Sequence, residues 1–393
     1  MKLLPLPADA VLRAQAALAS ENLERCTDML NMPELGEVVP AAVRDPLRKR
    51  LRAQKDQLEE LAGRVGPDSA TEDRWRELQF LTKEAEAQLA ESLGFLEGAL
   101  IRRSGLDGGI CRIADWLLDE LSASTGIGWV RLTILAAEES YAQRAGIIHL
   151  RFPEFTVWAL PLAAHEFGHV VAQELREMRA DGSFDYPVTS EITSAGSGAA
   201  HQRELFADIF ATYALGPAYP CTAILLRFSP TRGASPDADD QHPNDGKRVS
   251  AMLKTLRWLS RRADPVTRPY DGIAAALETT WTTALRATGA DDLDEEALDK
   301  VAYWVEVVYL PLLNKELEDA RYGGWGAALE LARRLDQRHD GAMGVPRIAD
   351  VLNAAWRARL ARPQDDNTVE RLGAAALELC RRGNGAADQR GRT

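Results

Sequence analysis

Residues 162–172 read Leu-Ala-Ala-His-Glu-Phe-Gly-His-Val-Val-Ala. His165 and His169 are four positions apart, so in a helix they share one face and both imidazoles can reach one metal ion. Glu166 points toward the same cleft and can act as general base on a metal-activated water. The flanking residues are apolar and mostly small, which predicts a helix buried in the middle of a domain. Two buried histidines and a glutamate are costly to desolvate without a metal, so we favour a metal site over a core helix that carries these residues by chance.

A third ligand is expected downstream. Residues 201–215 show the apolar spacing of a second amphipathic helix. Glu204 and Asp208 lie four apart on one face of it, and we expect Glu204 to be the third zinc ligand. Asp208 then accepts a hydrogen bond from a ligand histidine and fixes its tautomer. His201, one turn before Glu204, is the competing third ligand. A fourth position left for water is the mark of a catalytic site.

The order of these elements resembles a known family. An HExxH helix followed by a helix with E-x-x-x-D is similar to the gluzincin metallopeptidases, the broad group that includes thermolysin. Residues 242–248 then read His-Pro-Asn-Asp-Gly-Lys-Arg, and this HPxxxxR element is similar to the HtpX-like and CaaX prenyl protease group of gluzincins. The matching region covers about residues 111–260.

The resemblance implies a role for each matching residue. It implies zinc ligands at His165, His169 and Glu204, the general base at Glu166, and a supporting carboxylate at Asp208. It further implies that His242 and Arg248 line the cleft and either bind substrate or stabilise the oxyanion. Many proteins of that group are embedded in a membrane, whereas this chain has no run of 18 or more apolar residues. We therefore expect no membrane insertion.

Composition limits the classes of partner. The chain has 393 residues, 46% of them hydrophobic, which is enough for two or three domains with a real core. Its 47 basic and 59 acidic residues give a net charge of -12. That balance argues against nonspecific binding of nucleic acid or of an anionic membrane.

The cysteines and the first residues indicate the compartment. Four cysteines are scattered through the chain without a CxxC pair, which fits a reducing environment. Two prolines, Asp9 and Arg13 interrupt the apolar start too early for a cleaved signal peptide. We therefore expect a cytoplasmic protein.

The first region, residues 1–108, is expected to be a helical hairpin. Segments 8–30 and 37–108 have helical patterns, with a turn at 66–69. Leucines or alanine recur near heptad spacing at Leu78, Leu81, Ala85, Leu89, Leu93, Leu96 and Leu100. Such stripes are most often core, so the hairpin is interpreted as a scaffold packed on the catalytic unit. The alternative is an arm that binds a partner protein.

The second region, residues 109–262, is expected to be the catalytic core. We predict a helix at 111–124 and strands at 128–136 and 146–152. A strand just before the HExxH helix is where zincins bind extended peptide, because substrate backbone can add to its edge. We expect His149 to flank that edge as a substrate-binding residue; the alternative is a structural histidine, the commoner role of a lone histidine in a strand.

Two long segments around the core are interpreted as loops. Residues 180–200 and 229–246 are rich in turn-forming residues and are expected to be lids or binding loops, or else disordered. Tyr213 and Tyr219 are candidate donors to the oxyanion, and Tyr219 is taken as a substrate-binding residue.

The third region, residues 263–383, is expected to be helical. The apolar pattern predicts helices at 270–287, 293–318, 324–337, 346–361 and 367–382, followed by a disordered tail at 384–393. The fold class is therefore mainly α with a small β-sheet (α+β): a zincin-like core flanked by helical N- and C-terminal regions.

The sequence favours one function over two others. It predicts a soluble zinc-dependent endopeptidase that acts on a peptide or protein substrate with Zn²⁺ as cofactor. The alternative is a zincin-fold regulatory or sensor protein with weak or no hydrolysis; the intact Glu166 argues against it. A third reading is a helical interaction protein in which the motif is incidental.

Overall fold

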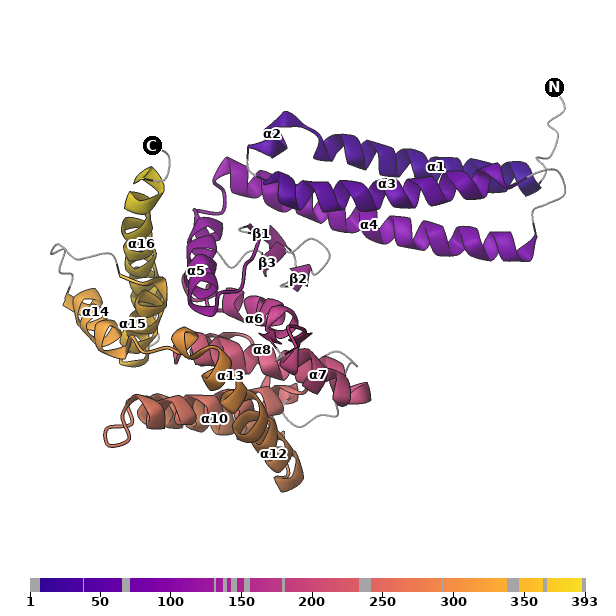
Figure 1. The fold of residues 1–393 in the computed structure, drawn as a ribbon. Helices are drawn as coiled ribbons and strands as arrows, with labels where there is room; N and C mark the ends of the chain where they lie inside the picture. Colours follow the sequence, from indigo (N-terminus) through magenta and orange to yellow (C-terminus); the bar gives the residue numbers. More distant parts are fainter. Residues whose placement is uncertain are drawn as a thin grey trace. The chain divides into compact units, whose positions relative to one another are not determined.

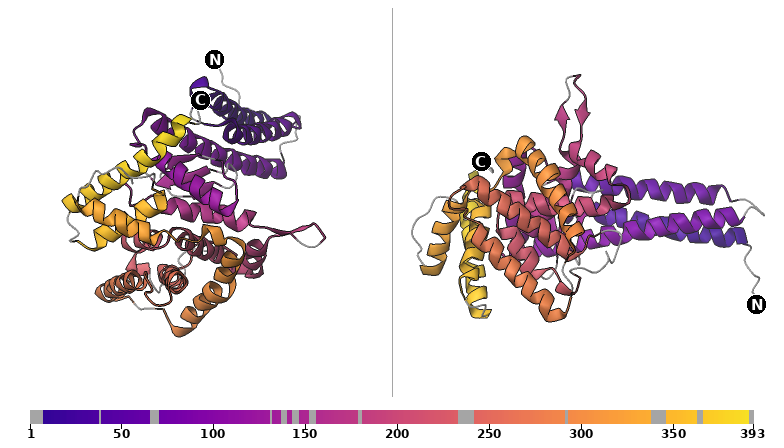
Figure 2. Two further views of the ribbon diagram at one scale, coloured as in Figure 1. Left: turned by 60° about the vertical axis from the view of Figure 1, so that its left-hand side comes forward. Right: turned by 90° about the horizontal axis from the view of Figure 1, so that it is seen from below.

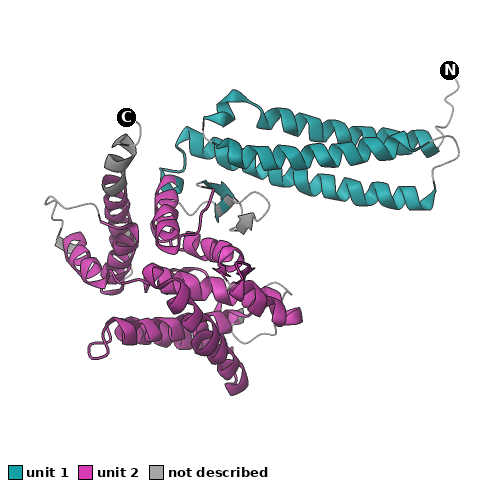
Figure 3. Cartoon of the chain, in the orientation of Figure 1, with its two compact units in different colours: residues 1–111, 132–152 teal, residues 112–131, 153–393 magenta. Residues whose placement is uncertain are grey.

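The computed structural model describes residues 8–37, 39–65, 71–130, 132–136, 140–142, 147–151, 156–178, 181–232, 242–290, 293–337, 346–362 and 366–390. The chain divides into two compact units (Figure 3). Residues 1–111 and 132–152 form unit 1, and residues 112–131 and 153–393 form unit 2. The fold is mainly α with a small β-sheet, as the sequence predicts.

Unit 1 is built on a bundle of three long helices, α1 (Ala8–Leu30), α3 (Ala41–Gly63) and α4 (Glu72–Ser104), with the short α2 (Pro33–Gly36) between the first two. The three helices lie side by side in Figures 1 and 2. Each buries one apolar stripe, such as Leu12, Leu23 and Leu30 on α1. The expected hairpin of α3 and α4 thus gains α1 as a third member.

A small sheet completes unit 1. Its strands are β1 (Thr133–Ala136), β2 (Ser140–Ala142) and β3 (Ile147–Arg151), in the order β1-β3-β2. β1 is parallel to β3, and β2 is antiparallel to β3. β1 packs on α4 at Gly98, where a Cβ atom would lie 2.4 Å from the Leu135 carbonyl oxygen. The strands expected at 128–136 and 146–152 are therefore present, in shorter form.

Unit 2 is helical around a buried central helix, α8 (Ala199–Leu215). The helices that contact α8 are α6 (Leu162–Glu174), α7 (Pro187–Ser194), α9 (Ala218–Leu226) and α10 (Asp245–Ala263). Residues 205–215 of α8 are buried without interruption. This burial explains why α8 is largely apolar over its second half, with Asp208 and Thr212 as its buried polar residues. α5 (Ile110–Thr125), most of which belongs to this unit, occupies the expected position at 111–124.

The segment 180–200 is not the irregular loop that its composition indicates. Strands β4 (Glu177–Met178) and β5 (Phe184–Asp185) form a hairpin that projects from unit 2 in Figure 2. α7 and the 3₁₀ turn η1 (Gly196–Gly198) follow. Pro187 suits the first turn of α7, and Val188 and Ile192, four apart, are buried. The burial of these two apolar side chains thus stabilises a helix in a segment whose polar composition indicates a loop. Of the second expected loop, 229–246, residues 233–241 lie outside the described part.

The C-terminal region is helical as expected. It contains α11 (Asp271–Thr288), α12 (Glu295–Ala302), α13 (Leu310–Glu316), α14 (Trp325–Gln337), α15 (Ile348–Leu360) and α16 (Asp366–Arg390), with the 3₁₀ turn η4 (Glu318–Ala320). A further 3₁₀ turn, η2 (Pro230–Arg232), precedes α10. The helix expected at 293–318 is divided by a π-helical segment, η3 (Tyr303–Tyr309). Pro311, just after this segment, has no N–H to donate to the preceding turn, which weakens the regular α pattern there. α16 extends into the segment expected to be a disordered tail, 384–393.

The chain divides into two compact units, whereas the sequence predicts four regions, at 1–108, 109–262, 263–383 and 384–393. The division into these four regions stays a prediction. None of the described helices combines the length and the apolar content needed to cross a bilayer.

The contact that matters most for the site is the close approach of α6 to α8. A Cβ atom at Gly168 would lie 2.9 Å from the Cα and 3.2 Å from the Cβ of Ala207. Because both residues are small, the two helix backbones come together one residue away from His169 and from Asp208. Any larger side chain at Gly168 must push the helices apart.

We predict that Gly168→Val lowers the free energy of unfolding of the full chain by about 1–3 kcal/mol, because overpacking of a tight helix contact is relieved only by moving α8. Urea unfolding followed by circular dichroism measures the change. Gly272→Val is the control, since a Cβ atom at Gly272 on α11 meets nothing within 4 Å. Equal effects of the two substitutions would show that the α6–α8 contact is not tight.

Candidate metal centre

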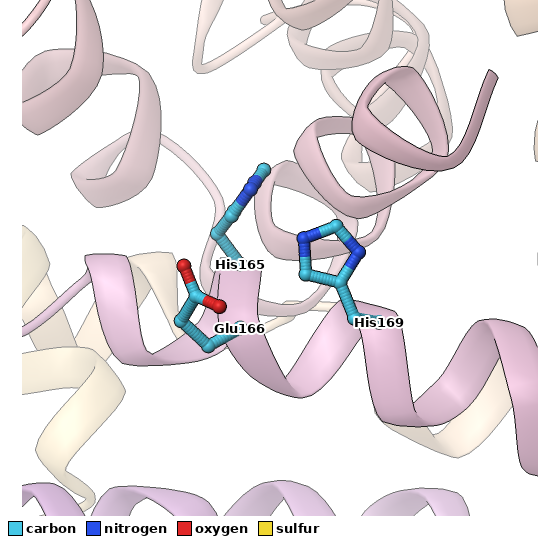
Figure 4. Close-up of side chains that lie close together, drawn as sticks. All are labelled: His165, Glu166 and His169. Atoms are coloured by element: carbon cyan, nitrogen blue, oxygen red, sulfur yellow. The ribbon is translucent and has the colours of Figure 1, made fainter. Parts of the chain in front are cut away.

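The HExxH residues lie together on α6. His165, Glu166 and His169 each offer one ligand atom, and these atoms all lie within 4.8 Å of one another. Figure 4 shows the three side chains extending from the same helix. All three are buried, with 7–8% of each residue exposed. The i, i+4 spacing of the histidines therefore brings both imidazoles to the same side of α6, as the sequence predicts.

Glu204 on α8 lies against both imidazoles. Its Oε2 is 3.3 Å from Nε2 of His165, and its Oε1 is 3.4 Å from Nε2 of His169. Both distances are long for a charge-assisted hydrogen bond. Two donor atoms bound tetrahedrally to one zinc ion at about 2.0–2.1 Å lie about 3.3–3.4 Å apart. The two distances from the Glu204 carboxylate to the imidazole nitrogens are therefore close to the spacing of atoms that share one zinc ion. Neither Glu204 nor the competing ligand His201 belongs to the cluster formed by His165, Glu166 and His169. Glu204 is favoured by its distances to both imidazoles.

Asp208, one turn further along α8, fixes the orientation of His165. Its Oδ1 lies 3.0 Å from Nδ1 of His165, and the residue is completely buried. An ionised carboxylate only accepts hydrogen bonds, so Nδ1 must carry the proton. The lone pair of neutral His165 is then on Nε2, the atom that faces Glu204. Asp208 thus plays the supporting role expected from its spacing.

Arg248 holds Asp208 in place. Its Nε and Nη2 donate to Oδ2 and Oδ1 of Asp208, at 2.7 and 2.9 Å. Nη2 also lies 3.6 Å from Oε2 of Glu204. α10 begins just before Arg248, where the Asn244 side chain caps the helix by accepting from the backbone N–H of Lys247. The resemblance implies that Arg248 binds substrate or stabilises the oxyanion. In the structure its Nε and Nη2 instead donate to Asp208.

Tyr219 also lies behind His165. Its hydroxyl donates a short hydrogen bond to Oδ1 of Asp208 and lies 3.0 Å from Nδ1 of His165. Only 1% of the residue is exposed, so Tyr219 lies on the buried side of His165. The sequence predicts a substrate-binding position for it, which this burial does not support. The cause is α9, which follows α8 directly and turns the tyrosine inward. Tyr213, the other candidate oxyanion donor, directs its hydroxyl to the carbonyl oxygens of Leu313 and Leu317.

Two predicted residues lie elsewhere. The His242 side chain is 52% exposed, and its Nε2 is 4.0 Å from Oε2 of Glu204. It is therefore an accessible polar side chain near Glu204, and its role in binding substrate or stabilising the oxyanion stays a prediction. His149 is in β3 of unit 1, where it pairs with Ile134 and Ser140. Its side chain is outside the described part, so a role in substrate binding stays a prediction.

The charges of the cluster are strongly coupled. Burial alone lowers the pKa of His165, but the neighbouring carboxylates of Asp208 and Glu204 outweigh burial and raise that pKa to about 10. Burial and the charge on His165 lower the pKa of His169 to about 4. Burial raises the pKa of Glu204, but the neighbouring His165 and Arg248 lower it to about 2. Asp208 is held ionised in the same way, chiefly by Arg248.

These pKa values describe the metal-free protein. At neutral pH His165 is a cation between two carboxylates, whereas His169 is neutral. The proton on Nε2 of His165 occupies the position between imidazole and Glu204 that a metal ion would take. Nδ1 of His169 is buried and has no hydrogen-bond partner among the described residues. The second histidine is therefore the less constrained of the two.

Comparison of the chain with models of known protein families, with curated proteins and with solved structures gave no match.

We predict that zinc binding at pH 6 releases about one proton. His165, whose pKa is about 10, must lose its Nε2 proton, whereas His169 and Glu204 are already deprotonated at that pH. Raising the pH removes the competing proton, so the apparent affinity should rise about tenfold per pH unit between pH 5 and 9. Calorimetry in buffers of different ionisation enthalpy counts the protons. Release of none, or of two, would contradict the assigned charges.

We predict that Tyr219→Phe weakens zinc binding about 10-fold, because loss of a group that orients a ligand typically costs 10- to 100-fold in affinity. The control is Tyr213→Phe, which removes a buried hydroxyl that does not contact the cluster. Competition with a chromogenic chelator measures both. Equal affinities in the two variants would remove Tyr219 from the site.

Proposed function

We propose that this chain is a zinc-dependent endopeptidase of the gluzincin type. The observation that carries the proposal is the position of Glu204, whose two carboxylate oxygens lie 3.3 and 3.4 Å from the Nε2 atoms of His165 and His169. A structural zinc site is closed by four protein ligands, whereas a catalytic one has three and an open position. The set of two imidazoles and one carboxylate is of the catalytic kind.

The donor set fits zinc. His165, His169 and Glu204 would hold the ion, since imidazole nitrogen and carboxylate oxygen are both common zinc ligands. Asp208, Arg248 and Tyr219 would support it from the buried side. The bound ion would polarise a scissile carbonyl and lower the pKa of water to roughly neutral. Because the net charge of the two imidazoles and Glu204 is negative once both histidines are neutral, a divalent cation is compensated there.

Glu166 is not needed as a ligand if His165, His169 and Glu204 hold the metal, so it is the residue of the cluster that can transfer a proton. It lies within 4.8 Å of both histidines through its ligand atom, yet Glu204 takes the place between them. It would accept a proton from the attacking water and deliver it to the leaving amine. His242, half exposed next to Glu204, is the best placed side chain to donate to the charge that develops on the carbonyl oxygen.

The setting we propose is the cytoplasm. All four cysteines are buried, and their scattered positions without a CxxC pair favour a reducing compartment. A peptide or protein is the proposed substrate, without nucleic acid and without membrane insertion.

We predict that Glu166→Gln keeps zinc and abolishes peptide cleavage, because the amide cannot accept the proton from water. His165→Ala should lose both zinc and activity. Incubation with a peptide library read by mass spectrometry, together with zinc content by elemental analysis, measures both properties. A loss of at least 100-fold in cleavage rate is expected for Glu166→Gln, in line with the contribution of a general base.

Glu174→Gln is the matched control. It makes the same chemical change on the same helix, at an exposed position, and should leave both zinc content and cleavage unchanged. Full activity in Glu166→Gln would refute the role of the base. Zinc binding without cleavage in the wild-type chain would favour the alternative, a zincin-fold regulatory protein.

A further inference from the structure

Helix α4 carries two parallel apolar stripes, of which the bundle uses one. The buried residues Leu78, Leu81, Ala85, Ser92, Phe95 and Ala99 follow heptad spacing along the face that packs in unit 1. The leucines at 89, 93, 96 and 100 also follow heptad spacing. Leu93, Leu96 and Leu100 each come one residue later than a member of the buried stripe, and Leu89 comes one residue later than the half-buried Gln88. One residue turns the direction by about 100° around a helix. The leucine stripe therefore lies beside the core and not in it.

The leucine stripe is open to solvent. Leu93 is 52% exposed and Leu100 is 58% exposed, whereas Leu89 and Leu96 are partly buried. Four leucines in two heptads form the seam that one helix offers to another in a coiled coil. An isolated exposed leucine needs no explanation, but a continuous seam does.

The ends of the seam carry opposite charges. In the heptad that places Leu93 and Leu100 at a and Leu89 and Leu96 at d, Glu86 is the preceding a position and Arg103 the following d position. Glu86 is exposed, and the Arg103 side chain is 38% exposed although it also lies 3.1 Å from Glu37. The order along the seam is thus acid, four leucines, base.

This order matches itself when a second copy is turned end for end. In an antiparallel pair centred between Leu93 and Leu96, Leu93 faces Leu96, Leu89 faces Leu100, and Glu86 faces Arg103 of the other copy. Both ends then form opposite-charge pairs. In a parallel pair, Glu86 would face Glu86 and Arg103 would face Arg103, which is unfavourable. The charges therefore select two-fold antiparallel pairing, the symmetry of the commonest dimers.

We propose that the chain forms a homodimer through the leucine seam of α4, antiparallel about a two-fold axis at Leu93–Leu96. A seam of four leucines buries less than the area of about 1,200 Å² that is usual for stable complexes. The dimer is therefore concentration-dependent, with a dissociation constant on the order of 10 µM. This proposal rests on unit 1 and is independent of the proposed peptidase activity.

Sedimentation velocity of the full chain between about 1 and 100 µM tests it, because that range brackets the expected dissociation constant. The wild type should pass from monomer to dimer. Leu93→Glu should be monomeric throughout, since it places a charge in the centre of the seam. The matched control, Leu18→Glu on α1, changes a leucine that is 60% exposed in the same bundle and should dimerise like the wild type.

Charge reversal tests the direction of pairing. Glu86→Arg and Arg103→Glu should each weaken the dimer at least 10-fold, and the double variant should restore it, because each copy then presents base and acid in exchanged positions. A wild type that is monomeric at all concentrations overturns the proposal. So does a dimer that Leu93→Glu leaves intact, or a double variant no tighter than the single ones.

Discussion

The candidate site depends on the contact between Gly168 and Ala207. HExxH alone places two imidazoles and a carboxylate on one helix, but the third ligand must come from elsewhere. With a Cβ atom at Gly168 only 2.9 Å from the Cα of Ala207, α8 is as close to α6 as two helices can be. Glu204 then reaches both Nε2 atoms, and Asp208, next to Ala207, reaches Nδ1 of His165. One small residue in each helix therefore determines the ligand geometry.

The cluster behind the ligands is stabilised by balanced charge. Asp208 is completely buried, and the Arg248 side chain is 12% exposed. Two hydrogen bonds join them, and Tyr219 adds a third to the same carboxylate. A buried ion pair contributes little net stability, but removal of one partner leaves an uncompensated charge and costs about 3–5 kcal/mol. The network is better explained by its effect on His165, whose tautomer it fixes, than by its contribution to folding.

The sequence predicts those features of the site that are set within one helix. The pairs His165–His169 and Glu204–Asp208 are four residues apart, and helical geometry brings each pair to one face whatever surrounds it. The mainly helical fold follows from periodicity for the same reason. The targets of Arg248 and Tyr219 could not be predicted, because each depends on how α9 and α10 pack on α8. Their side chains were assigned to the substrate side of the site, whereas the packing turns them toward Asp208.

Helix α4 shows a second limit. Its leucines suggest a single stripe, yet the core continues through Ser92 and Ala99, small residues that a search for large apolar side chains passes over. For the same reason residues 180–200, which have few large apolar side chains, were predicted to form a loop, although the buried Val188 and Ile192 anchor α7 there. In both places the buried face is decided by fit to a neighbouring element and not by hydrophobicity alone.

The central claim is that His165, His169 and Glu204 hold one zinc ion. The X-ray absorption spectrum of the zinc-loaded chain at the zinc K-edge tests it most directly, because imidazole rings give a distinct multiple-scattering pattern. The account predicts two imidazoles, with the remaining ligands oxygen at about 2.0–2.2 Å and no sulfur. A spectrum with three imidazoles would show that a third histidine binds the ion in place of Glu204. A shell of sulfur would show that a cysteine binds it. Either result would contradict the proposed ligand set.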